Sequence, residues 1–229
     1  MAVLNPNLEH LEAAAAALEP ILGELVFVGG TLTGLLVDDP GAGPARPTED
    51  VDVVAKILGT PGYQWAQAKM KALGFRPDTR DGAPVCRWVR GASVVDLVGT
   101  GETPLGATNR WYRWGFDLRV PYDLPSGRTI FILPALLFLL SKWEAFQSRG
   151  KGDFGGSRDI EDMLHVLSGC RSLRSGFEET PAEVRTGAAE MAQALLGSET
   201  FLGACLESLP DGKEVTRAIL EKLSGEPPR

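Results

Sequence analysis

A buried strand that ends in a double glycine, followed by a strand that carries two alternate aspartates, constrains this chain more than any other feature. The apolar run Leu25 to Val28 leads into Gly29-Gly30-Thr31, and Asp50-Val51-Asp52 opens a later apolar run. Side chains alternate along a strand, so Asp50 and Asp52 project from the same face. Their carboxylates repel each other unless a cation lies between them, and Mg²⁺ favours such oxygens. Because a glycine turn also offers backbone N–H groups to phosphate, the pattern predicts metal-assisted chemistry on a nucleotide.

The composition predicts a globular protein with one sizeable core or two modest ones, since 44% of the 229 residues are hydrophobic and 23% are charged. A net charge of −7 argues against nonspecific coating of nucleic acid, although a local basic patch is compatible with binding an RNA end. Cys86, Cys170 and Cys205 form no C-x-x-C pair, so we expect neither a zinc site nor a disulfide framework, and a cytoplasmic location fits best. No apolar run approaches the roughly 20 residues of a membrane span.

Hydrophobic periodicity predicts an α+β fold in which a mixed sheet with flanking helices precedes a helical C-terminal half. We place the boundary between residues 1–132 and residues 133–229. The expected strands are 25–28, 51–57, 85–89, 93–98 and 128–133, and the expected helices are 8–18, 30–36, 60–73, 134–146 and 157–167, with two or three more helices after them.

The strand 93–98 carries one carboxylate, Asp96, between apolar neighbours. A charged group inside an apolar strand is costly to bury without a partner, so Asp96 should meet a cation or hydrogen-bond donors.

Two segments together resemble the signature of the DNA polymerase beta nucleotidyltransferase superfamily. They are Gly29-Gly30-Thr31 and the stretch Arg46-Pro47-Thr48-Glu49-Asp50-Val51-Asp52. The resemblance is strongest to the abortive-infection (AbiEii-type) toxins and related minimal nucleotidyltransferases. The chain departs from the pattern in having a longer interval between the two segments, and the excess falls at 38–45, a Pro- and Gly-rich stretch that indicates a loop.

The resemblance implies a nucleotidyltransferase fold and assigns roles to this half of the chain. Asp50, Asp52 and Asp96 would be catalytic ligands of Mg²⁺ or Mn²⁺, with an NTP as co-substrate. The residues that would contact the nucleotide are Gly29, Gly30, Thr31, Arg46 and Thr48. Simpler interpretations exist: the aspartates as a solvated strand end, the glycines as an ordinary tight turn, and Arg46 as a loop charge.

The resemblance extends over 133–167, where it makes Lys142 a phosphate-binding catalytic residue at the other side of the site. Asp159 would orient Lys142 or act in catalysis, and Asp162 is the weaker candidate. The alternatives are a solvated lysine, and acidic residues that complement the dipole of a helix start. Pairing of Arg158 with Asp162 would also explain the second aspartate without catalysis.

Two arginines alternate with three aromatic residues at 109–114, a composition that suits stacking on bases or, as we favour, the core and rim of a hairpin. His10 and His165 are expected to be surface or packing residues.

The leading hypothesis is a transferase that moves NMP from an NTP to a hydroxyl acceptor. The toxin resemblance implies RNA, such as a tRNA 3′ end, or a protein as acceptor, and a possible antitoxin partner. The alternatives are a small-molecule transferase of the aminoglycoside-modifying kind and a nucleotide-binding protein without turnover.

Overall fold

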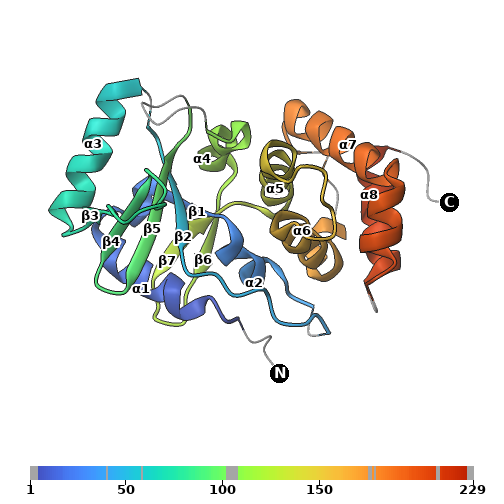
Figure 1. Cartoon of the computed structure of the whole chain (residues 1–229), viewed down its shortest axis with the longest axis horizontal. Helices are drawn as coiled ribbons and strands as arrows, with labels where there is room; N and C mark the ends of the chain where they lie inside the picture. Colours follow the sequence, from blue (N-terminus) through green and yellow to red (C-terminus); the bar gives the residue numbers. More distant parts are fainter. Residues whose placement is uncertain are drawn as a thin grey trace. The chain divides into compact units, whose positions relative to one another are not determined.

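A computed structural model describes residues 5–39, 41–57, 59–101, 108–174, 177, 179–209 and 212–225. The elements form an α+β protein with a mixed sheet and flanking helices, as predicted (Figure 1). The chain divides into two compact units. The sheet unit comprises Asn5–Gly34 and Arg46–Pro134, and the helical unit includes Leu35–Ala45 and the chain from Ala135 onward. The short segment 35–45 therefore groups with the helices although it lies within the first half of the sequence.

In the part of the chain that the structure describes, the sheet unit has seven strands in the order β3-β4-β5-β2-β1-β7-β6. β2 runs parallel to β5 and β1 runs parallel to β7, whereas the other neighbours are antiparallel. All five strands expected from the sequence are present. The bounds are β1 Leu25–Val28, β2 Val51–Ala55, β3 Arg76–Pro77, β4 Arg87–Arg90, β5 Ser93–Gly99, β6 Val120–Asp123 and β7 Thr129–Ile132.

The core of this unit lies around the central strands. Every residue of β1 is buried, because a strand between two others with covered faces needs apolar side chains on both sides. Helix α1, Leu8–Leu18, buries Leu11, Ala14, Ala15 and Leu18 and contacts β2 and β5. Pro20 lies in the short 3-10 helix Glu19–Glu24 that follows α1. Helix α3, Gly59–Ala72, is followed by Gly74 at a φ of +80°.

The arginine-rich aromatic segment differs from the predicted hairpin. It forms a 3-10 helix, Arg110–Trp114, followed by the short helix α4, Gly115–Leu118. The Asn109 side chain accepts a hydrogen bond from the backbone N–H of Trp111, which caps the start of this helix and explains why the segment turns. The hairpin does exist, but it lies later in the chain, where β6 pairs with β7.

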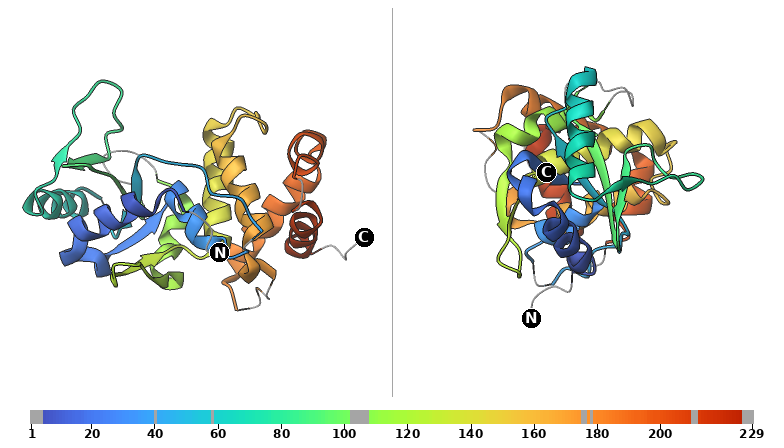
Figure 2. Two further views of the ribbon diagram at one scale, coloured as in Figure 1. Left: turned by 90° about the horizontal axis from the view of Figure 1, so that it is seen from below. Right: turned by 90° about the vertical axis from the view of Figure 1, so that its left-hand side faces the viewer.

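In the helical unit, α5 packs beside α6 and α7 packs beside α8, as the left view in Figure 2 shows. Their bounds are α5 Ala135–Arg149, α6 Arg158–Gly169, α7 Ala182–Leu196 and α8 Lys213–Ser224, with a π-helical turn at Phe201–Leu206. Among the described residues, no helix has both the length and the apolarity needed to cross a bilayer.

The stretch 38–45, expected to be a loop, is joined to the end of α6 through Asp38 and Asp39; Pro40 lies outside the described residues. The backbone N–H groups of Asp38 and Asp39 both donate to the carbonyl of Gly169, at 3.1 and 3.0 Å. The Asp38 carboxylate accepts from the N–H of Arg171 at 2.8 Å. A β-carbon on Gly169 would lie 2.6 Å from the Val37 side chain. Because glycine has no β-carbon, the segment that contains Val37 can lie close to the end of α6.

Candidate functional site

The turn after β1 takes a backbone conformation that only glycine adopts readily. Gly29 has φ 75° and ψ −168°, a region in which a β-carbon is strained. A β-carbon there would also lie 1.9 Å from Oδ2 of Asp52, so the Asp52 carboxylate rests directly against the turn. The hydroxyl of Thr31, which is fully buried, donates to the carbonyl of Val28 at 3.4 Å. The double glycine thus brings bare backbone next to one of the predicted metal ligands.

We expect Gly29→Ala to destabilise the protein by roughly 1–3 kcal/mol from backbone strain alone, with a further cost from the collision with Asp52. Chemical denaturation of the whole chain measures the loss. The double variant Gly29→Ala/Asp52→Ala removes the carboxylate atoms that the new methyl group would meet, so it should be more stable than Gly29→Ala. Equal stability of the single and double variants would show that the contact with Asp52 contributes nothing.

The sheet register brings the predicted carboxylates together. Asp52 on β2 pairs directly with Asp96 on β5. Directly paired residues share a face of the sheet, and Asp50, two positions before Asp52, belongs to the same face. Burial, followed by the charges of Asp96 and Asp52, raises the pKa of the neighbouring Cys86 thiol to about 11. The thiol is therefore protonated at neutral pH beside an acidic site.

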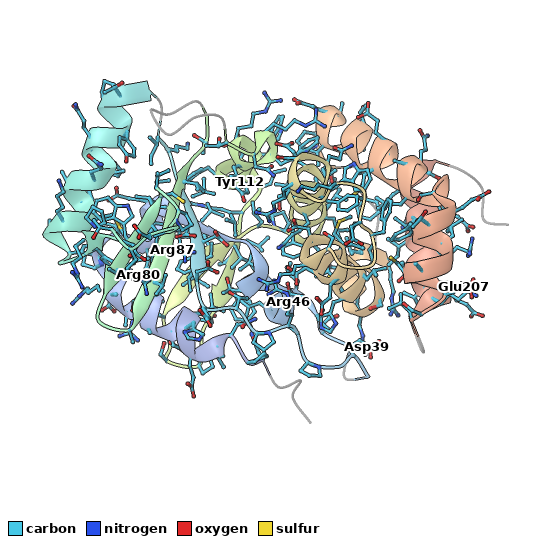
Figure 3. All side chains as sticks on the ribbon, in the orientation of Figure 1. Asp39, Arg46, Arg80, Arg87, Tyr112 and Glu207 are labelled. Atoms are coloured by element: carbon cyan, nitrogen blue, oxygen red, sulfur yellow. The ribbon has the colours of Figure 1, made fainter. Side chains whose placement is uncertain are left out.

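Arg87 of β4, which is labelled in Figure 3 and was not among the residues expected from the sequence, binds two of these carboxylates. Its Nε donates to Oδ1 of Asp96 at 2.8 Å and its Nη2 to Oδ2 of Asp96 at 2.7 Å, a bidentate pair. The same Nη2 also donates to Oδ2 of Asp50. The hydrogen bonds to Asp96 are the largest cause that raises the pKa of Arg87 above its ordinary value, so the guanidinium is charged at any ordinary pH.

A signal for this residue was present in the sequence. Gly91 and Ala92 separate two alternating runs, and a two-residue hairpin loop containing glycine fixes the register of the strands beside it. Counting outward from that loop places Arg87 opposite Asp96, which is the pairing observed.

The segment that enters β2 is held by Thr48 and by Asn7, a second residue that the sequence did not indicate. The Thr48 hydroxyl donates to the backbone carbonyl of Asp50 at 2.9 Å and to its carboxylate at 3.3 Å. Asn7 is fully buried, accepts from the N–H of Thr48 at 2.8 Å and donates to the carbonyl of Arg46 at 3.0 Å. Thr48 and Asn7 therefore fix the backbone and carboxylate of Asp50 from within the protein.

The donor chemistry of the three aspartates suits a hard divalent cation. One nitrogen of Arg87 already contacts oxygens from both Asp50 and Asp96, so a single positive group does lie between these two carboxylates. In the present arrangement, no set of three or more His, Cys, Asp or Glu side chains among the described residues is placed to hold a metal. The aspartates fit Mg²⁺ or Mn²⁺ chemically, but Arg87 binds the oxygens that the ion would need.

The helical unit contains a second charged group, formed by Lys142 and Arg149 of α5 and Asp159 and Asp162 of α6. Nζ of Lys142 lies 3.3 Å from Oδ1 of Asp159 and 2.6 Å from Oδ2 of Asp162, and their side chains are 8%, 5% and 1% exposed. Arg149 donates to both oxygens of Asp159, at 2.9 Å each. Lys142 is thus a buried residue, and Asp162, which the sequence ranked lower, is its nearer partner.

The structure thus brings Asp159 to Lys142, as an orienting role requires. A phosphate-binding role for Lys142 stays a prediction. Ser157 accepts from the N–H of Ile160 and caps α6, which places Asp159 in the first turn of the helix.

Asp159 should make the stability of the protein sensitive to acid. Burial raises the pKa of Asp159, but the hydrogen bonds from Arg149 and the charge of Lys142 outweigh burial and hold the pKa below its ordinary value of 3.8. A depressed pKa means that the stabilisation is complete above about pH 4 and is lost as the pH falls through the folded-state pKa. Melting temperatures measured from about pH 6 down to pH 2 should fall more steeply for the wild type than for Asp159→Asn. Parallel curves would contradict this assignment.

Among known proteins, this chain is similar only to solved structures, and not to a protein family or a curated protein sequence. No protein-family model matches the chain, and no curated protein matches it. An antigenic nucleotidyltransferase-like protein from Paracoccidioides brasiliensis is 19% identical, with 87% of this chain and 93% of that chain covered and a TM-score of 0.47. The antibiotic-resistance factor ANT(2'')-Ia is 13% identical, with coverages of 82% and 92% and a TM-score of 0.47. JHP933 from Helicobacter pylori is 12% identical, with coverages of 97% and 94% and a TM-score of 0.42.

Proposed function

We propose that the chain is a metal-dependent nucleotidyltransferase that transfers NMP from an NTP to a hydroxyl acceptor and releases pyrophosphate. The observation that carries the proposal is the pairing of Asp52 with Asp96 on adjacent parallel strands, with Asp50 bound to the same guanidinium as Asp96. Three carboxylates on one face of a sheet, beside a glycine turn, are a costly arrangement for a purely structural role because like charges repel.

Each residue has a defined part in this proposal. Asp50, Asp52 and Asp96 would hold Mg²⁺ or Mn²⁺, which when bound neutralises phosphate charge and orients the reacting groups. Gly29 is half-buried and lacks a side chain, so its backbone would let a phosphate group approach closely, whereas Gly30 is buried. Asp52 is placed against this turn by the absence of a side chain on Gly29. Thr48 positions Asp50 through its two hydrogen bonds.

The acceptor follows from the sequence resemblance alone. We propose an RNA end or a protein side chain, with an antitoxin as a possible partner, because the two motif segments resemble the toxin branch. A small hydroxyl compound of the aminoglycoside kind is the alternative acceptor.

A nucleotide-binding protein without turnover is a second candidate function, and one observation favours it. Arg87 already neutralises Asp50 and Asp96, as a structural salt bridge would. A protein of this kind would bind NTP but transfer nothing.

Incubation of the protein with each α-labelled NTP, Mg²⁺ or Mn²⁺, and either total RNA or cell lysate tests the proposal. We expect one macromolecular fraction to take up label and expect EDTA to abolish the uptake. Isothermal titration with each NTP separates the two candidates: nucleotide binding without label transfer or pyrophosphate release would support the non-catalytic function. Label on an added aminoglycoside, with none on RNA or protein, would assign the small-molecule acceptor.

A further inference from the structure

Arg87 lies where a cation would be needed to relieve the repulsion between Asp50 and Asp96. Its guanidinium forms a bidentate pair with Asp96 and shares Nη2 with Asp50. The Arg87 side chain is 19% exposed and that of Asp96 is 9% exposed, so water screens this pair weakly. A divalent ion must therefore compete with the guanidinium of Arg87 for the carboxylates of Asp50 and Asp96.

A guanidinium can exchange one kind of anion for another. Its planar set of donors binds carboxylate and phosphate oxygens with similar bidentate geometry. The triphosphate of a nucleotide carries several such oxygens and can take the place of the carboxylates as the partner of Arg87. The carboxylates released in this way would again need a counter-ion, and a divalent cation carried with the triphosphate supplies one.

We propose that Arg87 is a built-in counter-cation that holds Asp50 and Asp96 until a nucleotide arrives. Arg87 then turns to the phosphates, so that the metal binds tightly only together with the nucleotide. The nucleotide part of this inference rests on the proposed function. The first part, competition between Arg87 and a metal for the aspartates, requires no turnover. Arg87 is in this view a positioning residue that controls when the site becomes able to bind metal.

Binding of Mn²⁺ alone, measured by isothermal titration and by electron paramagnetic resonance, tests the competition. We expect Arg87→Met, which keeps the length of the side chain but removes its charge, to bind Mn²⁺ at least about tenfold more tightly than the wild type, as expected when a positive charge next to the ligands is lost. Arg90→Met is the matched control, because Arg90 lies on the same strand and donates to the carbonyl of Ala17 rather than to a carboxylate. This control should bind Mn²⁺ as the wild type does.

Two further variants locate the effect. Arg87→Met/Asp96→Asn should lose the gain in Mn²⁺ affinity, which would place the bound ion at the aspartates. Arg87→Lys keeps the positive charge but cannot form the bidentate pair, so its affinity for Mn²⁺ should lie between those of the wild type and Arg87→Met. If Arg87→Met does not fold, Arg87→Lys replaces it in the test. Equal Mn²⁺ affinity in folded wild type and in the Arg87 variant would overturn the proposal.

Adding ATP, or the NTP that binds best, tests the exchange. The Mn²⁺ affinities of the wild type and Arg87→Met should then approach each other, because the phosphates draw Arg87 away from the aspartates in the wild type. A difference that persists unchanged with bound nucleotide would contradict the exchange. The proposed function and the role of Arg87 can fail independently. If no label is transferred, the proposed function fails, but the comparison of Mn²⁺ binding without nucleotide still holds. If the wild type and Arg87→Met bind Mn²⁺ equally, the role of Arg87 is refuted even when the protein is an active transferase.

Discussion

Asp52→Asn is expected to reduce nucleotide transfer by at least about 100-fold while leaving the protein folded, since even residues that only support metal ligands cost 10–100-fold when changed. The amide has nearly the same shape as the carboxylate, so the packing of this side chain against Gly29 is retained, but one negative ligand is lost. Removal of a repelling charge next to Asp96 should leave the melting temperature unchanged or raise it.

The measurement is uptake of α-labelled NMP into the acceptor fraction, together with thermal unfolding of each variant. Asp117→Asn is a suitable control, because Asp117 is an exposed aspartate of the same unit that lies on α4. Transfer by Asp52→Asn at a rate near that of the wild type would reject the catalytic interpretation of the aspartate pair.

Lys142→Met is expected to destabilise the protein by about 3–5 kcal/mol, the cost of removing one partner from a buried ion pair. Lys142 contacts Asp159 and Asp162, whose side chains are 5% and 1% exposed. Arg149 still binds Asp159 in this variant, so the loss falls mainly on Asp162. Denaturation with urea, followed by circular dichroism, measures the change.

Lys151→Met is the matched control for Lys142→Met, because Lys151 is exposed and lies in the turn after α5. Its stability should equal that of the wild type. The double variant Lys142→Met/Asp162→Asn removes both charges of the closer pair and should regain part of the lost stability. A change of less than about 1 kcal/mol in Lys142→Met, the range of an exposed salt bridge, would show that the group contributes little to folding.

The same variants bear on the phosphate-binding role predicted for Lys142. If stability is regained in the double variant but nucleotide affinity is not, Lys142 has a part in binding beyond its structural one. If stability and affinity return together, the loss of affinity in Lys142→Met follows from destabilisation of the fold.

Features that depend on local geometry could be predicted from the amino-acid sequence. Alternation placed Asp50 and Asp52 on one face, and apolar periodicity located β1, β2, β4, β5 and β7 and the helices α1, α3, α5 and α6, but not the short strands β3 and β6. The turn after β1 followed from its double glycine. The pairing of Arg87 with Asp96 was also within reach, because a short hairpin loop sets the register of the two strands that it joins.

The contacts between segments far apart in the sequence became known only from the folded structure. The parallel pairing of β2 with β5, which sets Asp52 beside Asp96, depends on a long connection that does not fix a register. The contact of Arg87 with Asp50 depends on that pairing in turn. The hydrogen bonds that join Asp38 and Asp39 to the end of α6 likewise depend on tertiary packing. The closer contact of Lys142 with Asp162 does so too, because a buried charge is stabilised by the counter-charge that helix packing brings within reach.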